Sequence, residues 1–230
     1  MEGSRAIKDK KMEHIKLKVE KTAHLYTHNT ASQSTKYLWI VAHGYGQTAN
    51  RIIRKFTHLN HEHAVIAPEG LNRFYLEMGK SRAVGASWMT SEDRLDEIDD
   101  FNNLLNQIEK DYLPKLNEDV KIILLGFSQG GATILRWINA HRPKCHYVVL
   151  WGAAFPHDID YAPLQNYFLH KKLYLIIGDN DEYINSENKI GQRAFLEKNN
   201  LSVTEVNFEG KHEILVSVLD AFIEMNIYSM

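Results

Sequence analysis

A serine in a glycine-framed turn is the first residue whose type and surroundings suggest chemistry. Ser128 lies within Gly-Phe-Ser-Gln-Gly at 126–130, after the apolar run 120–125 and before a helical pattern over 132–140. A G-x-S-x-G sequence between a strand and a helix is typical of a sharp turn that lifts a nucleophilic hydroxyl out of the sheet. The alternative is a glycine-rich turn with an incidental serine. We predict that Ser128 is a nucleophile.

A serine nucleophile needs a base that takes its proton, and the base needs a carboxylate that fixes its tautomer. Two histidines follow predicted strands, His43 and His212. We expect His43 to hydrogen bond within its own loop, so His212 is predicted to be the base. Three carboxylates follow another predicted strand, those of Asp179, Asp181 and Glu182. The residues alone leave these three open, but the chain order of serine, acid and histidine is that of one class of serine hydrolase.

The negative charge that develops on a substrate oxygen needs two N–H donors close by. The residue after the nucleophile gives one donor, which here is Gln129. A residue in the loop after the first buried strand gives the other, which here is Tyr45. Its neighbours Gly44 and Gly46 allow the backbone to approach a substrate closely. The sequence therefore predicts an oxyanion hole formed by the backbone N–H groups of Tyr45 and Gln129.

These residues can meet only if several strands end at the same edge of a sheet. Predicted strands, most of them continuous apolar runs, lie at 37–42, 64–67, 120–125, 147–151, 173–177 and 203–208. Predicted helices lie at 48–59, 90–112, 132–140, 186–199 and 214–227. This alternation predicts an α/β fold with a mostly parallel sheet and helices on both faces. Open parallel sheets bind ligands at the carboxyl ends of their strands, where Ser128 and His212 fall.

The N-terminal part of the chain is expected to contribute little to the site. Residues 1–11 are polar and basic, so we expect a disordered tail, or sequence upstream of a natural start at Met12. One α/β domain is expected over 12–230. Within it, the alternating residues of 15–19 and the stretch 24–28 predict a hairpin of two strands at the edge of the sheet.

Three further stretches bear on the surroundings of the site. The stretch 71–88 has no clear period and is expected to be a long aromatic-bearing loop with a functional use. Residues 90–93 resemble a capping box at the start of the longest helix. The interval 152–172 has no sustained apolar stripe, so no large cap domain is expected over the site.

Composition excludes several classes of function. The chain has 230 residues and a formal net charge of −2, so no nucleic acid partner is expected. Its one cysteine, Cys145, excludes an internal disulfide and gives no sign of an oxidising compartment. No apolar run reaches the roughly 18 residues of a membrane span, so we expect a cytoplasmic protein without stable membrane insertion. The stretch 61–63, His-Glu-His, suggests a metal, but a surface loop is the favoured interpretation, and no metal or cofactor is expected.

Several stretches resemble motifs of one known family, the phospholipase/carboxylesterase family of α/β-hydrolases, which includes the acyl-protein thioesterases. Residues 126–132 look like its nucleophile signature, and His-Gly-Tyr-Gly-Gln-Thr at 43–48 resembles its His-Gly-Leu-Gly-Asp-Thr loop. Gly-Asp-Asn-Asp at 178–181 is similar to its Gly-Asp-x-Asp, in which the second Asp is the triad acid, so the resemblance implies Asp181. Gly-Lys-His-Glu at 210–213 resembles the family's stretch that carries the base.

The resemblance runs from about Tyr37 to the C-terminus and implies an α/β-hydrolase fold. It implies a serine hydrolase of carboxylic esters that works through a Ser128-His212-Asp181 triad and an acyl-enzyme intermediate. Thioesters and lysophospholipids remain open as substrates. The alternatives are a peptidase or lactonase with the same triad, and a non-catalytic protein that only binds a ligand. The expected partner is a small-molecule ester, and a homodimer is left open.

The walls of a substrate pocket are expected close to the predicted triad. Four residues near the predicted site are candidates for its walls, with an ordinary core residue as the alternative for each: Tyr75, Met78, Trp88 and Phe155. The chain departs from the family's motifs at Tyr45, Gln47 and Lys211. These departures spare the triad and fall around the pocket, so they leave the substrate open.

Overall fold

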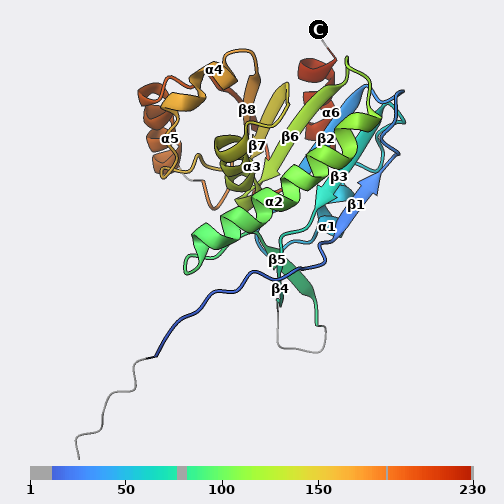
Figure 1. Cartoon of the computed structure of the whole chain (residues 1–230). Coiled ribbons are helices and arrows are strands. Elements are labelled where there is room, and N and C mark those ends of the chain that lie inside the picture. Colours follow the sequence, from blue (N-terminus) through green and yellow to red (C-terminus); the bar gives the residue numbers. More distant parts are fainter. Residues whose placement is uncertain (1–11, 77–81, 185, 229–230) are drawn as a thin grey trace, which may run out of the picture.

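A mostly parallel sheet of seven strands forms the centre of the part that the computed structural model describes, residues 12–76, 82–184 and 186–228 (Figure 1). The strands are β1 (Leu25–His28), β2 (Tyr37–Ala42), β3 (His63–Pro68), β6 (Lys121–Phe127), β7 (Tyr147–Trp151), β8 (Lys172–Gly178) and β9 (Thr204–Phe208). Their order across the sheet is β1-β3-β2-β6-β7-β8-β9. β1 is antiparallel to β3, and the other pairings of this sheet are parallel. The predicted α/β class is confirmed.

Helices cover both faces of the sheet. The helices are α1 (Ala49–Ile53), α2 (Arg94–Tyr112), α3 (Gln129–His141), α4 (Gln165–Phe168), α5 (Ser186–Lys198) and α6 (Val216–Phe222). α2 and α3 lie on one face, and α1 and α6 lie on the other, where a π-helical turn (Ile223–Ile227) extends α6 (Figure 1). Short 3₁₀ turns at Leu113–Lys115 and Ala162–Leu164 complete the helical elements of the described residues. None of the helices described is long and apolar enough to cross a membrane.

The continuous apolar runs of the sequence are explained by burial of both faces of the sheet. Along β2, Leu38 and Ile40 pack into the core beneath α2 and α3, whereas Trp39 and Val41 pack into the core beneath α1 and α6. All four side chains are at most 2 % exposed. Burying one such side chain contributes about 1.5–3 kcal/mol, so the central strands anchor both layers.

The parallel register brings the carboxyl ends of the strands to one edge. Ala42 at the end of β2 pairs with Gly126 of β6, and Phe127 of β6 pairs with Trp151 at the end of β7. Gly178 at the end of β8 pairs with Phe208 at the end of β9. The loops that follow these strands therefore start side by side, as the sequence predicts.

The predicted N-terminal hairpin is wrong, although its second strand is confirmed as β1 at the edge of the sheet. Ile15, Leu17 and Val19 alternate with polar residues, but all three are exposed and residues 12–24 form no strand. β1 pairs with β3 instead of with this stretch. The stretch contacts the start of α2, where Lys16 Nζ lies 3.1 Å from a carboxylate oxygen of Asp93. An alternating pattern allows one face to be buried, but here no neighbouring strand covers that face.

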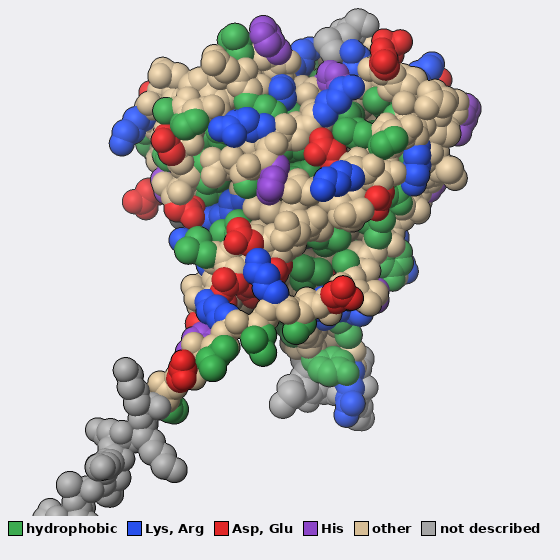
Figure 2. All heavy atoms as spheres, viewed as in Figure 1, with side chains coloured by type: hydrophobic (Ala, Val, Ile, Leu, Met, Phe, Trp, Pro, Cys, Tyr) green, Lys and Arg blue, Asp and Glu red, His purple; other side chains and the backbone are tan. Residues whose placement is uncertain are grey.

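The stretch 71–88 is not a structureless loop. It contains two antiparallel strands, β4 (Asn72–Tyr75) and β5 (Val84–Ser87), which form a hairpin that projects from the body (Figures 1 and 2). The predicted capping box at 90–93 is also wrong, because no side chain caps α2 and the Thr90 hydroxyl instead donates to the Glu97 carboxylate at 3.0 Å. The helix predicted over 48–59 is shorter, since α1 ends at Ile53 and turns follow.

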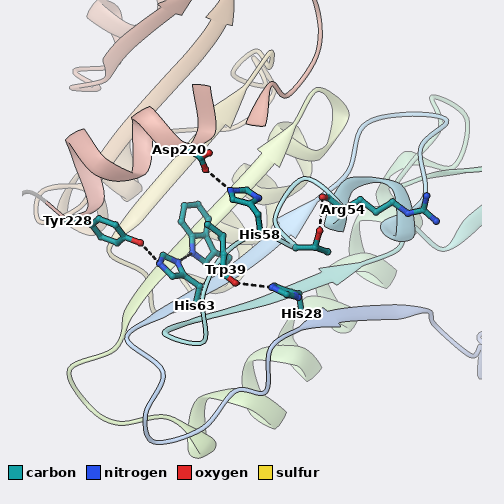
Figure 3. Close-up of polar contacts among 9 residues, drawn as sticks. His28, Trp39, Arg54, His58, His63, Asp220 and Tyr228 are labelled. Carbon is teal, nitrogen blue, oxygen red and sulfur yellow. Dashed lines mark hydrogen bonds and ion pairs between the residues drawn. The ribbon is translucent and has the colours of Figure 1, made fainter. Parts of the chain in front are cut away.

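A polar cluster fixes the C-terminal helix to the sheet (Figure 3). His63 Nδ1 accepts a hydrogen bond from Trp39 Nε1 at 3.0 Å, so its Nε2 carries the proton and donates to the Tyr228 hydroxyl at 2.6 Å. Burial lowers the pKa of His63 to about 4. His58 Nε2 lies 2.5 Å from Asp220 of α6. Both ring nitrogens of His63 are thus hydrogen bonded, and the described residues hold no metal-binding group of three or more ligands.

Candidate active site

Ser128 lies at a strained turn between β6 and α3. Its backbone angles are φ 53° and ψ −120°, which few residues other than glycine adopt, and its N–H donates to Trp151 O at 2.9 Å. The turn is tight enough that a Cβ on Gly126 would lie 2.4 Å from Gly130 O, and one on Gly130 would lie 2.2 Å from Ala42 O. Both positions therefore need glycine, and the start of α3 comes close against the end of β2.

Asp181, which is buried, and His212, which is partly buried, form a pair after β8 and β9. His212 Nδ1 lies 2.7 Å from Asp181 Oδ2. Asp181 Oδ1 accepts the backbone N–H groups of Tyr183 at 2.9 Å and Ile184 at 3.1 Å. Its carboxylate is an acceptor on both oxygens, so Nδ1 of the imidazole carries the proton and Nε2 is left to accept one. Asp179, the other aspartate of this loop, is exposed.

The imidazole of His212 is held in place on several sides. Trp151 Nε1 donates to Glu213 O at 2.9 Å and so anchors the loop next to the imidazole. The rings of Phe127 and Tyr183 lie 4.9 and 4.6 Å from it, centroid to centroid. Gly152 has φ 54°, and a Cβ there would lie 3.0 Å from His212 Cε1 and Nδ1. Space for the imidazole thus depends on a glycine at the end of β7.

The serine and the histidine share neighbours. Phe127 precedes Ser128 and contacts the His212 ring, and Trp151 accepts from Ser128 N–H and holds the residue after His212. Among the residues that the structure describes, no hydrogen bond joins Ser128 Oγ to His212. In sites without substrate such a contact is often long and tightens when substrate binds.

Two backbone N–H groups near Ser128 are unpaired. Within the described residues, the N–H groups of Tyr45 and Gln129 make no hydrogen bond, whereas the N–H of Gly46 donates to Ala86 O at 2.9 Å. Gln129 begins α3, where the first N–H groups of a helix lack internal partners and the helix dipole favours negative charge. These two groups are the ones that the sequence predicts as oxyanion donors.

His43 fixes the peptide group that carries the Tyr45 N–H. His43 is fully buried; its Nε2 accepts from Gly70 N at 2.9 Å and its Nδ1 donates to Gly44 O at 2.8 Å. Burial lowers its pKa, which favours this neutral form. Because Gly44 C=O and Tyr45 N–H belong to one planar peptide, the hydrogen bond from His43 sets the direction of that N–H. His43 therefore acts within its loop, as expected.

The sequence did not reveal that Trp88 supports this same loop. Trp88 Nε1 donates to His43 O at 2.8 Å, and the two rings lie 5.0 Å apart. The Gln129 side chain holds this segment in turn, because its Oε1 accepts from Trp88 N at 3.1 Å and its Nε2 donates to Met89 O at 2.9 Å. A chain of hydrogen bonds thus connects the two predicted oxyanion residues through Trp88 and His43.

The predicted pocket walls do not gather at one place. Trp88 and Phe155 are 1 % and 2 % exposed, so the structure places both in the core, which was the alternative for each. Tyr75 is 59 % exposed on β4, and Met78 lies outside the described residues. Trp88 and Phe155 are therefore core residues and do not line an open pocket.

A cleft of about 200 Å³ opens beside the histidine instead. It reaches from the loop after β2, across α1, to the loop after β9. Its lining residues are Gln47, Arg51, Ile52, Lys55, Phe127, His212, Glu213 and Ile214. Sequence reasoning missed the contribution of α1. The available signal was the spacing of Arg51 and Lys55, which places both side chains on one face of a helix that directly follows the predicted oxyanion loop.

Comparisons with known proteins identify the family of the chain and its fold. A family model described as Phospholipase/Carboxylesterase matches residues 24–227. No curated protein sequence gives a significant match.

Solved structures share the fold at low sequence identity. Acyl-protein thioesterase 2 from Zea mays superposes with a TM-score of 0.65 at 17% identity, covering 88% of this chain and 97% of its own. A Bacillus cereus carboxylesterase gives 0.62 at 17% identity over 88% and 92% of the two chains. A phospholipase/carboxylesterase from Dyadobacter fermentans gives 0.57 at 19% identity over 89% and 96%. At such identities the structural likeness bears on the fold alone.

Proposed function

Because the chain belongs to the phospholipase/carboxylesterase family and is thus a hydrolase of the ester-cleaving type, we propose that it hydrolyses carboxylic esters through Ser128, His212 and Asp181. The observation that carries this proposal is the 2.7 Å contact between His212 Nδ1 and buried Asp181, next to the strained turn of Ser128. The contact leaves Nε2 as the acceptor that a serine nucleophile needs. We propose that its partner is a small-molecule ester and that the enzyme is cytoplasmic.

The first half of the reaction forms an acyl-enzyme. His212 Nε2 takes the proton of Ser128 Oγ, and this oxygen attacks the ester carbonyl. The carbonyl oxygen becomes an oxyanion, which the Tyr45 and Gln129 N–H groups bind. Losing one such donor costs about 3–4 kcal/mol of transition-state stabilisation. The C–O bond then breaks, and His212 gives its proton to the departing alcohol.

The second half regenerates the enzyme. Water loses a proton to His212 Nε2 and attacks the acyl carbon, and the Ser128 oxygen leaves with that proton as the acid product is released. Asp181 keeps the imidazole in the required tautomer in both halves and stabilises its positive charge. Thioesters and lysophospholipids present the same acyl carbon with other leaving groups, so the same steps apply to them.

The thiol of Cys145 is a poor alternative nucleophile. It is buried, and its burial raises its pKa to about 11, so it is not a thiolate near neutral pH. Its Sγ contacts the Tyr167 hydroxyl at 3.0 Å, and it precedes β7, away from the carboxyl edge of the sheet. This observation supports a serine as the reacting group.

Covalent labelling tests the proposal directly. We expect the chain to react with a fluorophosphonate probe at one site and to hydrolyse 4-nitrophenyl acetate. Ser128→Ala should remove the labelling and nearly all turnover, leaving at most about 10³-fold over water from the remaining site. Peptide mapping locates the label, and circular dichroism shows whether the variant is folded. Labelling that persists in folded Ser128→Ala would overturn the assignment of the nucleophile.

A further inference from the structure

The cleft beside His212 is bordered by two cationic side chains. Arg51 and Lys55 line it from α1 and the turn after it, one helical turn apart, with Ile52 between them. Neither forms an ion pair or a side-chain hydrogen bond with any residue that the structure describes. Glu213 is the one carboxylate that lines the cleft. Two cations against one carboxylate leave an excess of one positive charge.

This excess of positive charge is local. The whole chain has a formal net charge of −2, and on the face seen in Figure 2 the cationic and anionic side chains are interspersed. α1 itself has no acidic residue (Ala49–Ile53, sequence ANRII). Unpaired cations in a concave site attract anions more strongly than the same charges on a flat, mixed surface, because the low-dielectric walls focus their field.

The cleft borders the candidate site at His212 and at the loop after β2. It is lined both by Gln47, in the loop of the predicted oxyanion donor, and by His212, the proposed base. A base that has taken the serine proton returns it to the oxygen of the leaving group, so that group must lie next to the imidazole. A group bound in a cleft that borders this imidazole is thus placed as the alcohol or thiol part of a substrate would be, and the inference below rests on this adjacency.

We propose that the cleft is a leaving-group subsite for an anionic substituent, a carboxylate or a phosphate, which is bound by Arg51 and Lys55. The inference rests on the proposed function and adds a substrate class to it: esters whose alcohol part carries a negative charge. The Arg51 guanidinium can bind either anion with two parallel N–H groups, and the half-buried Lys55 adds a point charge.

Two esters that differ in one charge test the proposal. The probes are 4-nitrophenyl acetate and the acetate ester of 3-carboxy-4-nitrophenol, which share the acyl group and release a chromogenic phenol. For the wild-type chain we expect kcat/KM to favour the carboxylated ester about three- to tenfold at low salt, mainly through KM. The preference should shrink as NaCl is raised, because the cleft is open to solvent.

Matched variants show whether the two cations cause the preference. The double variant Arg51→Gln, Lys55→Gln should lose the preference. Arg54→Gln, from the same turn of chain but outside the cleft, should keep it; the Arg54 side chain is exposed and points away from the polar cluster in Figure 3. A wild-type preference near one, or a preference that survives in the double variant, would overturn the subsite while the esterase proposal stands.

Binding of the product tests the subsite without turnover. Saturation-transfer NMR with 3-carboxy-4-nitrophenol and 4-nitrophenol should show stronger binding of the carboxylated phenol, and the double variant should lose this difference. If the chain cleaves neither ester but binds the carboxylated phenol in this way, the esterase proposal fails and the anionic subsite remains. Equal binding of both phenols by the wild-type chain contradicts the subsite.

Discussion

Asp181→Asn changes one atom of the predicted triad and almost nothing else in its surroundings. Asp181 Oδ1 accepts from the N–H groups of Tyr183 and Ile184, and the amide oxygen of Asn can keep both contacts. The amide nitrogen then takes the place of Oδ2, 2.7 Å from His212 Nδ1. Because this nitrogen is a donor, Nδ1 must become an acceptor and the imidazole proton moves to Nε2. A base with a proton on Nε2 cannot take one from Ser128.

The expected loss in kcat is about 10⁴-fold, or about 5.5 kcal/mol, with KM nearly unchanged. The free energy of unfolding should change by less than about 1 kcal/mol, since both backbone N–H groups keep an acceptor. Asp181→Ala leaves those N–H groups unpaired in a buried site, so it should destabilise the fold by about 1–3 kcal/mol. The two variants thus separate the tautomer from the structural role of the carboxylate.

The assay is hydrolysis of 4-nitrophenyl acetate, combined with urea unfolding of each variant. Asp179→Asn is the matched control, because it is the same substitution two residues away on an exposed side chain. It should keep kcat within about a factor of three, in line with the small effects of exposed charges. The reasoning is refuted if Asp181→Asn retains more than a tenth of wild-type kcat, or if Asp179→Asn is the more damaging of the two.

Two further predictions concern Gly152 and His63. Gly152→Ala should lower kcat at least several-fold and the free energy of unfolding by about 1–2 kcal/mol, because φ is 54° and the new Cβ would lie 3.0 Å from His212 Nδ1. Gly191→Ala, where a Cβ meets nothing within 4 Å, should leave kcat unchanged; equal losses in both variants would contradict this. Burial lowers the pKa of His63 from 6.5 to about 4, so the unfolded chain takes up a proton at a higher pH than the folded chain does. The contribution of His63 to the free energy of unfolding is therefore fully present above pH 6.5 and falls by up to about 3 kcal/mol as the pH drops to 4. Urea unfolding between pH 4 and 7 should show a shallower pH dependence in His63→Gln, and an unchanged slope would assign the effect elsewhere.

The sheet and the serine turn could be predicted because their signals are local. A fully apolar run such as β2 has few alternatives to a strand buried on both faces, and glycines around Ser128 are required by contacts within a few residues. The choice of Asp181 over Asp179 had no such signal. It depends on which side chain turns inward after β8, and without the family resemblance the three carboxylates remained open.

The errors arose where the outcome depends on distant parts of the chain. The alternation of residues 15–19 indicates that one face could be buried. Whether another strand covers that face depends on residues far away in the chain. Trp88 was predicted as a pocket wall, and its actual contact is with His43, 45 residues away in the chain. The spacing of Arg51 and Lys55 was visible in the sequence, but the cleft between α1 and the loop of His212 is a tertiary feature.

The tie between Tyr228 and His63 has a consequence for how activity is lost on heating. α6 begins four residues after His212, and its π-helical extension ends next to Tyr228, which hydrogen bonds to the start of β3. Parts of a fold can open locally at a lower free-energy cost than global unfolding. If this helix opens, the loop of His212 loses its support on the α6 side, although the serine and the central strands stay in place. We therefore expect activity to be lost through local opening of α6 and its extension, at a temperature below that of global unfolding.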